Sequence, residues 1–480
     1  MAIAVHECCH EIKEFREDWC LLEALDGGTR KMRCEGELRL PKWPAEDEAS
    51  YRARLATATL FPAWKRTVSV MSGKPFSKSL SLSDAHPSIE LWAEDIDLQG
   101  VSLHSFASEM FIESVGFGLA GILVDFPRVP PSAGTPRTVA QVEATGARPY
   151  WVRVKHNQIL GWRAKNVGGR MKLTQLRLLE TYEEEDGPYG TVSKPQVRVL
   201  SPGNWEIWRE TPPEGLTKRG NGNVAAPQNA WRIAESGTTT LADIPFVPLY
   251  GLRDGFMVGR PPLMDLAHLN VKHWQSQSDQ DTILHVARVP ILAMIGADES
   301  SQLTVGAASA VKLPLNADIK FVEHTGAAIK AGAESLDALV NQMIQTGAEL
   351  LVKRGGNATV VGDANDAEAN KSDLQRMAEN FEDALDQALV YTAQFASLSK
   401  PGSIELFDDY GAATLSDASA SLVKELNMAG LISKKTTIDE MKRRGILSAE
   451  VDPDTEAEAV ADEGPPLGAL AVPPEDGADE

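Results

Sequence analysis

Apolar residues recur at helical spacing in three long segments of the second half of the chain. The middle segment is typical, because Leu336, Leu339 and Met343 fall on one stripe of a helix among small and polar residues. Proline marks both ends of the first segment, since Pro262 suits the first turn of a helix and Pro290 cannot continue one. The predicted helices span residues 262–288, 327–354 and 368–398.

The two inserts between these helices differ in character. Residues 290–326 contain glycine, proline and short β-like runs such as AVKLPL and IKFVEH. Gly355–Asn370, with the sequence GGNATVVGDANDAEAN, is polar and has no apolar cluster that could bury it. This arrangement predicts two antiparallel long helices joined by the first insert, with a polar loop before the third helix. It favours an extended structural protein, such as a channel or ring subunit, over an enzyme with a closed pocket.

The first half of the chain predicts an α+β domain. Helices are expected over Glu11–Leu25, about Ala45–Phe61 and Leu103–Gly116, and the apolar run Ile122–Phe126 predicts a buried strand. From Tyr150 to Leu249, β-branched and aromatic runs alternate with turn residues, which predicts a meandering antiparallel sheet. The expected fold class is therefore α+β and mainly helical.

The C-terminal region changes from structured patterns to an acidic tail. A short strand, SIELF, is followed by expected helices over Ser416–Gly430 and Thr436–Arg444. Glu450–Glu480 holds eleven acidic residues and no Lys or Arg, so the tail carries −11 of the net charge of −21 and is expected to be disordered. No basic stripe suited to tight duplex binding is present, so DNA, if it is a partner, is passed along rather than gripped.

Cysteine usage and hydropathy predict a soluble protein made in a reducing cytoplasm. All four cysteines lie within the first 34 residues, and the N-terminus has neither the basic start nor the apolar core of a signal peptide. The longest apolar run, Ser114–Val124, is too short to cross a bilayer.

The sequence HECCH at the N-terminus matches the H-E-x-x-H pattern of zinc peptidases. On a helix this spacing would place His6 and His10 on one zinc ion, with Glu7 as the general base. Against this, the motif lies close to a chain end, no cleft is expected around it, and the further Gly and His of the longer motif are absent. We expect a chance match on an amphipathic N-terminal helix, with adventitious metal binding that also uses Cys8 and Cys9 as the smaller alternative.

Other sequence patterns also argue against an enzyme. GFGLAG, residues 116–121, satisfies G-x-G-x-x-G, but its glycines end a helix and precede a strand, which is the reverse of a dinucleotide site. We therefore expect a helix C-cap and a tight turn there. No P-loop or G-x-S-x-G sequence is present, and the acidic run Glu183–Asp186 is expected at a solvated hairpin tip. Neither a catalytic residue nor a cofactor is predicted.

Lys353 and Arg354 stand where the second long helix is expected to meet the polar loop. Two interpretations weigh evenly. Cations at a helix C-terminus complement the helix dipole, or the pair contributes to a ring of positive charge that touches DNA phosphates where the loop projects. In the second case, Asn357, Asp363 and Asn365 of the loop are further candidates for the lining of a DNA channel.

Several segments, in this order, resemble phage portal proteins. LPKWPAEDEASYRARLATATLFPAWKRTVSVMSGKPF and GILVDFP resemble a portal subfamily described only as a domain of unknown function. DLAHLNVKHWQSQSDQDTILHVARVPIL is similar to the helix that enters the portal stem, and EANKSDLQRMAENFEDALDQALVYTAQF to the long helix after the tunnel loop. GLISKKTTIDEMKRRGILSAEVDPDTEAEAVADE resembles the closing segment of portals. The likeness spans most of residues 15–463.

The resemblance implies a ring of twelve copies at one capsid vertex. The implied parts are an α+β wing (1–260), a first stem helix (261–289), a clip (290–326), a second stem helix (327–354), a tunnel loop (355–367), a long wing helix (368–398), a C-terminal wing or helical crown (399–449) and an acidic tail (450–480). It implies no catalytic residue.

The implied role is a channel in the virion, assembled in the host cytoplasm. Genomic double-stranded DNA would be packaged through it by the terminase and later ejected, without sequence-specific contacts. The implied partners are the terminase large subunit, a major capsid or scaffold protein and a head-completion or adaptor protein, and no membrane is involved. The alternatives are a zinc metallopeptidase that uses HECCH, which the resemblance does not explain, and a shorter ring-forming connector or adaptor.

Overall fold

The chain divides into two compact units, Met1–Leu406 and Phe407–Glu480. The computed structural model describes residues 3–127, 146–211, 230–287, 291–295, 318–322, 326–348, 372–408, 427–428, 432–443, 447, 451–452 and 455–456. In the second unit the described helix is α13 (Lys434–Arg443), which agrees with the helix predicted over Thr436–Arg444. The following paragraphs concern the first unit.

Helices and antiparallel sheets alternate along the first unit, which confirms the α+β class. The helices are α1 (His10–Asp26), α2 (Gly28–Glu35), α3 (Glu48–Thr57), α4 (Ala63–Gly73), α5 (Pro87–Trp92), α6 (Leu103–Phe117), α8 (Met264–Ala287), α9 (Ala327–Ala348) and α11 (Asp373–Ala396), with short 3₁₀ turns η1 (Gly36–Leu38) and η2 (His156–Gln158). The strands are β1 (Ser81–Ala85), β2 (Leu119–Asp125), β3 (Tyr150–Val154), β4 (Ile159–Val167), β5 (Arg170–Asp186), β6 (Gly190–Ser201), β7 (Asn204–Thr211), β8 (Ala230–Thr238), β9 (Phe246–Tyr250), β10 (Leu252–Gly255), β11 (Val258–Arg260), β12 (Ile291–Ile295), β13 (Asp318–Val322) and β14 (Pro401–Glu405).

The hydrophobic core is built on a three-stranded antiparallel sheet of order β3-β2-β9. Residues 119–124 of the central strand β2 are all buried, as expected of a strand that is covered on both faces. Helices α6 and α11 pack against this sheet and against each other, and the rings of Phe111 and Phe381 lie 5.1 Å apart. Trp151 Nε1 of β3 donates a hydrogen bond of 2.8 Å to Thr392 Oγ1 of α11. The third predicted long helix is therefore part of the core.

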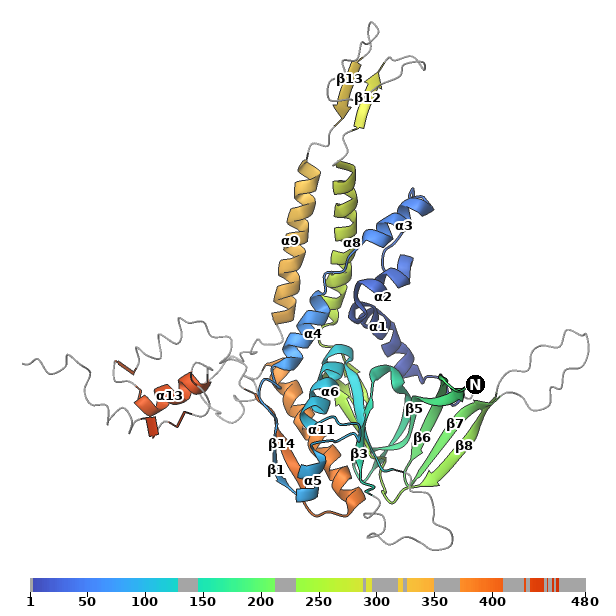
Figure 1. Ribbon diagram of the computed structural model, residues 1–480, viewed down its shortest axis with the longest axis vertical. Helices are drawn as coiled ribbons and strands as arrows, with labels where there is room; N and C mark the ends of the chain where they lie inside the picture. The colour runs from blue at the N-terminus through green and yellow to red at the C-terminus, as the bar shows by residue number, and fades with distance from the viewer. Residues whose placement is uncertain are drawn as a thin grey trace, which may run out of the picture. The chain divides into compact units, whose positions relative to one another are not determined.

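A second, five-stranded sheet runs as a meander in the order β4-β5-β6-β7-β8 (Figure 1). All of its neighbouring strands are antiparallel, which confirms the predicted meander for β4 to β8. The first and last runs of the prediction form β3 and β9, which belong to the three-stranded sheet instead. The acidic run Glu183–Asp186 forms the exposed last residues of β5, which confirms its predicted place at a solvated hairpin tip, although these residues still pair with β6. The turn itself falls one residue later, where Gly187 adopts a positive φ of 74°.

The segment after Leu40 contains two helices where the sequence predicted one over Ala45–Phe61. Helix α3 begins after Asp47, whose side chain accepts hydrogen bonds from the amides of Ala49 and Ser50. It ends before Ala58, and α4 starts after Pro62. The predicted end at Phe61 was therefore too late, and α4 was not predicted.

The GFGLAG sequence forms the junction between α6 and β2, as predicted. Gly118 is the C-cap of α6 and has a left-handed φ of 83°, a conformation that favours glycine. A β-carbon at this position would lie 2.5 Å from the carbonyl carbon of Arg260 and from the nitrogen of Pro261. The glycine therefore allows β11 to approach the turn closely.

A buried histidine joins α1, α6 and η2. His156 is 4% exposed, its ring stacks on Phe117 at 3.6 Å, and its two ring nitrogens face Glu113 Oε1 at 2.5 Å and Glu23 Oε1 at 3.0 Å. A neutral imidazole has one N–H, so two such hydrogen bonds require a further proton, either on the ring or on a carboxyl group.

Replacing His156 with glutamine is expected to lower the free energy of unfolding by about 1–3 kcal/mol, because the largely buried Glu113 would lose its close partner. Urea denaturation measures the change. His10→Gln is the matched control, since the His10 side chain is 82% exposed and its loss is expected to leave stability unchanged. Equal effects of the two substitutions would contradict this role for His156.

Candidate channel helices and the N-terminal cleft

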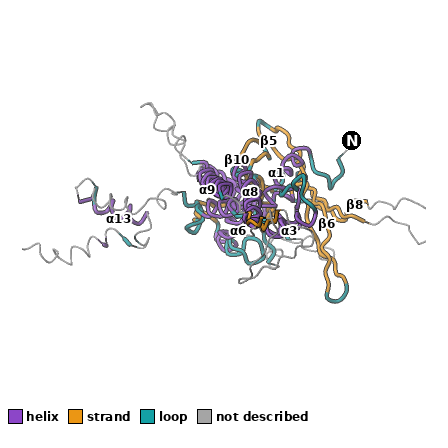
Figure 2. The backbone as a smooth tube through the Cα atoms, turned by 90° about the horizontal axis from the view of Figure 1, so that it is seen from above, coloured by secondary structure: helices purple, strands orange, loops and turns teal. Residues whose placement is uncertain are grey.

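Helices α8 and α9 lie side by side and run antiparallel (Figures 1 and 2). Near the end of α8, Gln280 Nε2 donates a hydrogen bond of 2.9 Å to the carbonyl of Ile329 at the start of α9. Gly332 makes room for this amide, because a β-carbon there would lie 2.0 Å from Gln280 Oε1. The apolar stripe predicted for the second long helix, Leu336, Leu339 and Met343, is buried.

Amide side chains hold the N-terminal half of α8 against the body of the unit. Asn270 is fully buried, and its Oδ1 accepts a hydrogen bond of 2.9 Å from the backbone amide of Trp64. Its Nδ2 donates one of 2.8 Å to the carbonyl of Phe61, and Gln275 Nε2 donates one of 3.0 Å to the carbonyl of Arg39. These contacts could not be predicted from the sequence, because polar residues on a helix normally face water. Burial also lowers the pKa of His273, which favours its uncharged form.

The face of α9 that points away from α8 is made of small and polar residues with one large apolar exception. Lys330 and Glu334 are exposed and form an i,i+4 ion pair of 3.8 Å. Ile344 is 64% exposed in the single chain. An exposed isoleucine on a long helix is a candidate for burial against another molecule.

The predicted DNA-channel residues lie outside the described residues. Helix α9 is described to Ala348, and the description resumes at Ser372, the N-cap of α11. Lys353, Arg354, Asn357, Asp363 and Asn365 fall between these two points, so their role stays a prediction. The whole proposed tunnel loop falls in the same interval.

The HECCH sequence does not have the helical geometry that a zinc peptidase needs. Helix α1 begins at His10, so His6 and His10 are not one turn apart on a helix. The His6 ring stacks on Trp231 at 5.2 Å, whereas His10 faces Glu14 at 3.5 Å. Within the described ranges, no group of three or more His, Cys, Asp or Glu side chains could hold a metal ion. The expected position of the motif on the N-terminal helix was therefore wrong for its first four residues.

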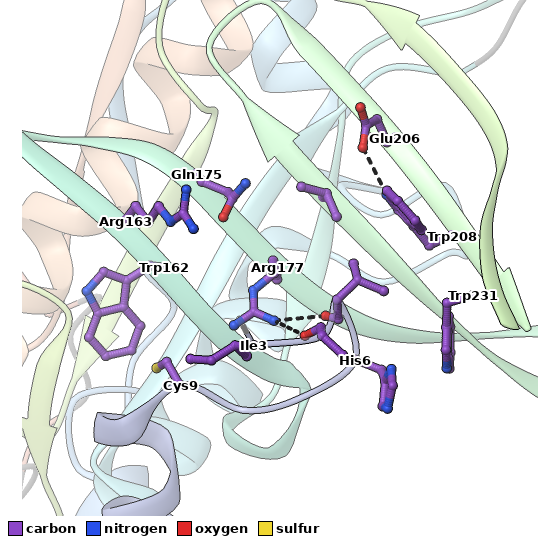
Figure 3. A pocket seen from close by; sticks show the side chains of 13 residues that line it. Ile3, His6, Cys9, Trp162, Arg163, Gln175, Arg177, Glu206, Trp208 and Trp231 are labelled. Carbon is purple, nitrogen blue, oxygen red and sulfur yellow. Dashed lines mark hydrogen bonds between the residues drawn. The ribbon is translucent and has the colours of Figure 1, made fainter. Parts of the chain in front are cut away.

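The absence of a cleft around this segment, expected from its position at the chain end, was also wrong. Residues 3–6 and Cys9 line a cavity of about 860 Å³ on the five-stranded sheet (Figure 3). Cys9 N donates a hydrogen bond of 2.9 Å to the carbonyl of Leu160 in β4, which fixes the end of the segment to the sheet edge. We call residues 3–9 the N-terminal arm and this cavity the sheet cleft.

Among the described helices, none is long and apolar enough to cross a membrane. The described cysteines, Cys8, Cys9, Cys20 and Cys34, are free thiols.

Comparison with known proteins gives limited information. A family model described as a domain of unknown function, DUF4055, matches residues 262–396, which include α8, α9 and α11. No curated protein matches the chain.

Solved structures with similarity to the chain come from gene transfer agent (GTA) particles. One, "Neck of empty GTA particle computed with C6 symmetry", is 13% identical with a TM-score of 0.39, and the match covers 80% of this chain and 90% of that one. A second, "Virion of native gene transfer agent (GTA) particle", is 14% identical with a TM-score of 0.38 over 86% and 97% of the two chains. A third, "Neck of native GTA particle computed with C12 symmetry", is 13% identical with a TM-score of 0.38 over 78% and 87%. These scores do not establish a common fold.

Proposed function

We propose that this chain is a phage portal protein, a subunit of a ring-shaped channel at one capsid vertex. Twelve copies would surround a path through which the terminase packages genomic DNA and through which the DNA is later ejected. Head-completion or adaptor proteins would attach to the same ring, and a capsid or scaffold protein would surround it. The role is structural, and no catalytic step is assigned to the chain.

The observation that carries the proposal is the path of the chain through α8, α9 and α11. The chain leaves the α+β body along α8, returns along the antiparallel helix α9 and re-enters the core as α11. This order is the one that the sequence resemblance implies for the first stem helix, the second stem helix and the long wing helix. The amide contacts of Asn270 and Gln275 would hold a stem rigidly on its wing.

The charge of the chain supports a channel through which DNA moves without being held. Each copy carries −21, so a ring of twelve copies would repel phosphate over most of its surface. Lys353 and Arg354 would provide local positive charge where the tunnel loop meets the DNA. The zinc peptidase alternative lacks support, since His6 and His10 do not have the helical spacing that it requires.

The exposed face of α9 provides a test of the proposal. In a ring, this face would contact a neighbouring copy, and Ile344→Glu would place a charge in that interface. The substitution is expected to convert the ring to monomers in analytical ultracentrifugation, because an unpaired buried charge opposes association. Val167→Glu, which adds the same charge at an exposed apolar residue of β4 in the five-stranded sheet, is the control and is expected to leave the rings unchanged. Rings of unchanged mass for Ile344→Glu would contradict the placement of α9 at a subunit interface.

A further inference from the structure

Side chains from adjacent strands of the five-stranded sheet line the bottom of the sheet cleft. Arg177 of β5 stands opposite Val199 of β6, and Val199 stands opposite Glu206 of β7. Directly opposed residues point to the same face of a sheet, so these three side chains form one row across it. The volume of the cavity, about 860 Å³, falls in the range of ligand-binding sites in proteins.

Three half-buried tryptophans from three strands line the cleft, namely Trp162 of β4, Trp208 of β7 and Trp231 of β8 (Figure 3). Trp208 Nε1 donates a hydrogen bond of 2.8 Å to Glu206 Oε2, which fixes its indole and occupies the carboxylate. Trp231 already stacks with one ring, that of His6. Tryptophans that are partly exposed around a cavity are typical of binding surfaces, and aromatic grooves bind extended, proline-containing peptides.

Two arginines line the cleft without a salt bridge to any described carboxylate. Among the described residues, neither Arg163 nor Arg177 forms an ion pair, although both line the cavity. Burial lowers the pKa of Arg177, and the neighbouring charge of Arg163 acts in the same direction. A ligand that brings a carboxylate would complement both guanidinium groups.

The N-terminal arm shows how the cleft holds a peptide. Arg177 Nη1 donates to the backbone carbonyls of Ala4 at 3.0 Å, Val5 at 2.9 Å and Glu7 at 2.8 Å. The His6 ring of the arm supplies the aromatic contact with Trp231. The cleft thus already combines backbone recognition by a guanidinium with stacking on an indole.

We propose that the sheet cleft is a docking site for an extended peptide segment of a partner protein, with a carboxylate directed to Arg163 and Arg177 and proline or apolar side chains against the tryptophans. A protein segment is favoured over single-stranded nucleic acid, because the cleft already binds backbone carbonyls of a polypeptide, those of the N-terminal arm, through Arg177. The proposal concerns the five-stranded sheet and does not depend on ring assembly.

A peptide selection tests the proposal. A display library of random ten-residue peptides is selected on the immobilised full-length chain, with the Arg163→Glu chain used for counter-selection. The sequences that depend on Arg163 are expected to contain Asp or Glu beside proline or an aromatic residue. Selected sequences without acidic residues, or none that depend on Arg163, would overturn the proposal.

The most enriched peptide is then labelled with fluorescein and titrated against three variants by fluorescence polarisation. Trp162→Ala and Arg163→Glu are each expected to weaken binding by about tenfold. Lys165→Glu, an equal charge change on β4 at an exposed residue that does not line the cavity, is expected to leave binding unchanged. Equal loss in Lys165→Glu would overturn the proposal, because it would show attraction by general charge. Displacement of the peptide by oligothymidylate would also overturn it, in favour of nucleic acid.

Discussion

Replacing Gly118 with alanine is expected to lower the free energy of unfolding of the first unit by about 2–5 kcal/mol. A left-handed conformation costs an L-residue about 1–2 kcal/mol, and forcing an extra carbon into a well-packed site costs about 1–3 kcal/mol. Both terms apply, since Gly118 has a φ of 83° and an added β-carbon would lie 2.5 Å from the backbone of Arg260 and Pro261. Backbone atoms cannot move aside as a flexible side chain can. Urea denaturation of the purified variant measures the loss.

Gly203→Ala separates the two contributions. Gly203 has a similar φ of 76°, but no atom lies within 4 Å of an added β-carbon. Its substitution is expected to cost only the conformational part, about 1–2 kcal/mol. If Gly118→Ala were no more destabilising than Gly203→Ala, the close approach of β11 to the α6–β2 turn would be incorrect.

Removing either partner of the Arg54–Glu46 ion pair is expected to destabilise the segment around α3 by about 2–3 kcal/mol. The side chains are 4% and 3% exposed, and Arg54 Nε and Nη2 each donate to the Glu46 carboxylate at 2.7 Å. The guanidinium also lies over the Trp43 ring at 4.2 Å. Breaking a deeply buried pair costs about 3–5 kcal/mol. The expected loss is smaller here, because each group keeps another hydrogen bond when its partner is removed: Arg54 Nη2 donates to the carbonyl of Pro41 at 2.9 Å, and Glu46 Oε2 accepts from the amide of Trp43 at 3.1 Å.

Acidification provides a second measurement on the same pair. The hydrogen bonds from Arg54 lower the pKa of Glu46, so ionised Glu46 stabilises the folded chain. This contribution is complete above the unfolded-state pKa of about 4.3 and is lost as the pH falls through the lower folded-state pKa. The stability difference between the wild type and Glu46→Gln is therefore expected to hold at pH 7 and to shrink below about pH 4.

Glu48→Gln is the matched control for the ion pair. Glu48 follows two residues later but pairs with Lys42 and Arg52 at an exposed position. Its substitution is expected to leave the unfolding transition unchanged. A loss as large as that of Glu46→Gln would mean that general surface charge, rather than the buried pair, stabilises α3.

Periodicity was sufficient to predict the long helices because their apolar stripes face a core. The stripe of α11, which includes Leu374, Phe381 and Leu385, is buried against the three-stranded sheet. Its N-terminus could also be predicted, since Ser372 and Gln375 form a capping box. The predicted helix over Ala45–Phe61 ends too late, because α3 stops at Thr57, and α4 was not predicted.

The features of the candidate sites that could not be predicted from the sequence are contacts between residues far apart in the chain. Nothing in the local sequence distinguishes Asn270 and Gln275 from other polar helix residues. Their hydrogen bonds depend on backbone groups of Trp64 and Arg39, which the fold brings next to α8. The sheet cleft brings residues from β4, β5, β6, β7 and β8 together with an arm more than 150 residues away in sequence, and no local sequence pattern predicts that contact. The prediction that HECCH lies on the N-terminal helix was wrong, because α1 begins only at His10, the last residue of that sequence.

The central claim is ring assembly, and electron microscopy of the purified chain together with its mass in solution tests it most directly. The chain is measured alone and after co-expression with a capsid and a scaffold protein of the kind that the proposed function requires. The account predicts rings of about twelve times 52.0 kDa with a central hole wide enough for duplex DNA. A monomer of 52.0 kDa in both preparations, above all one that carries a zinc ion per chain, would contradict it.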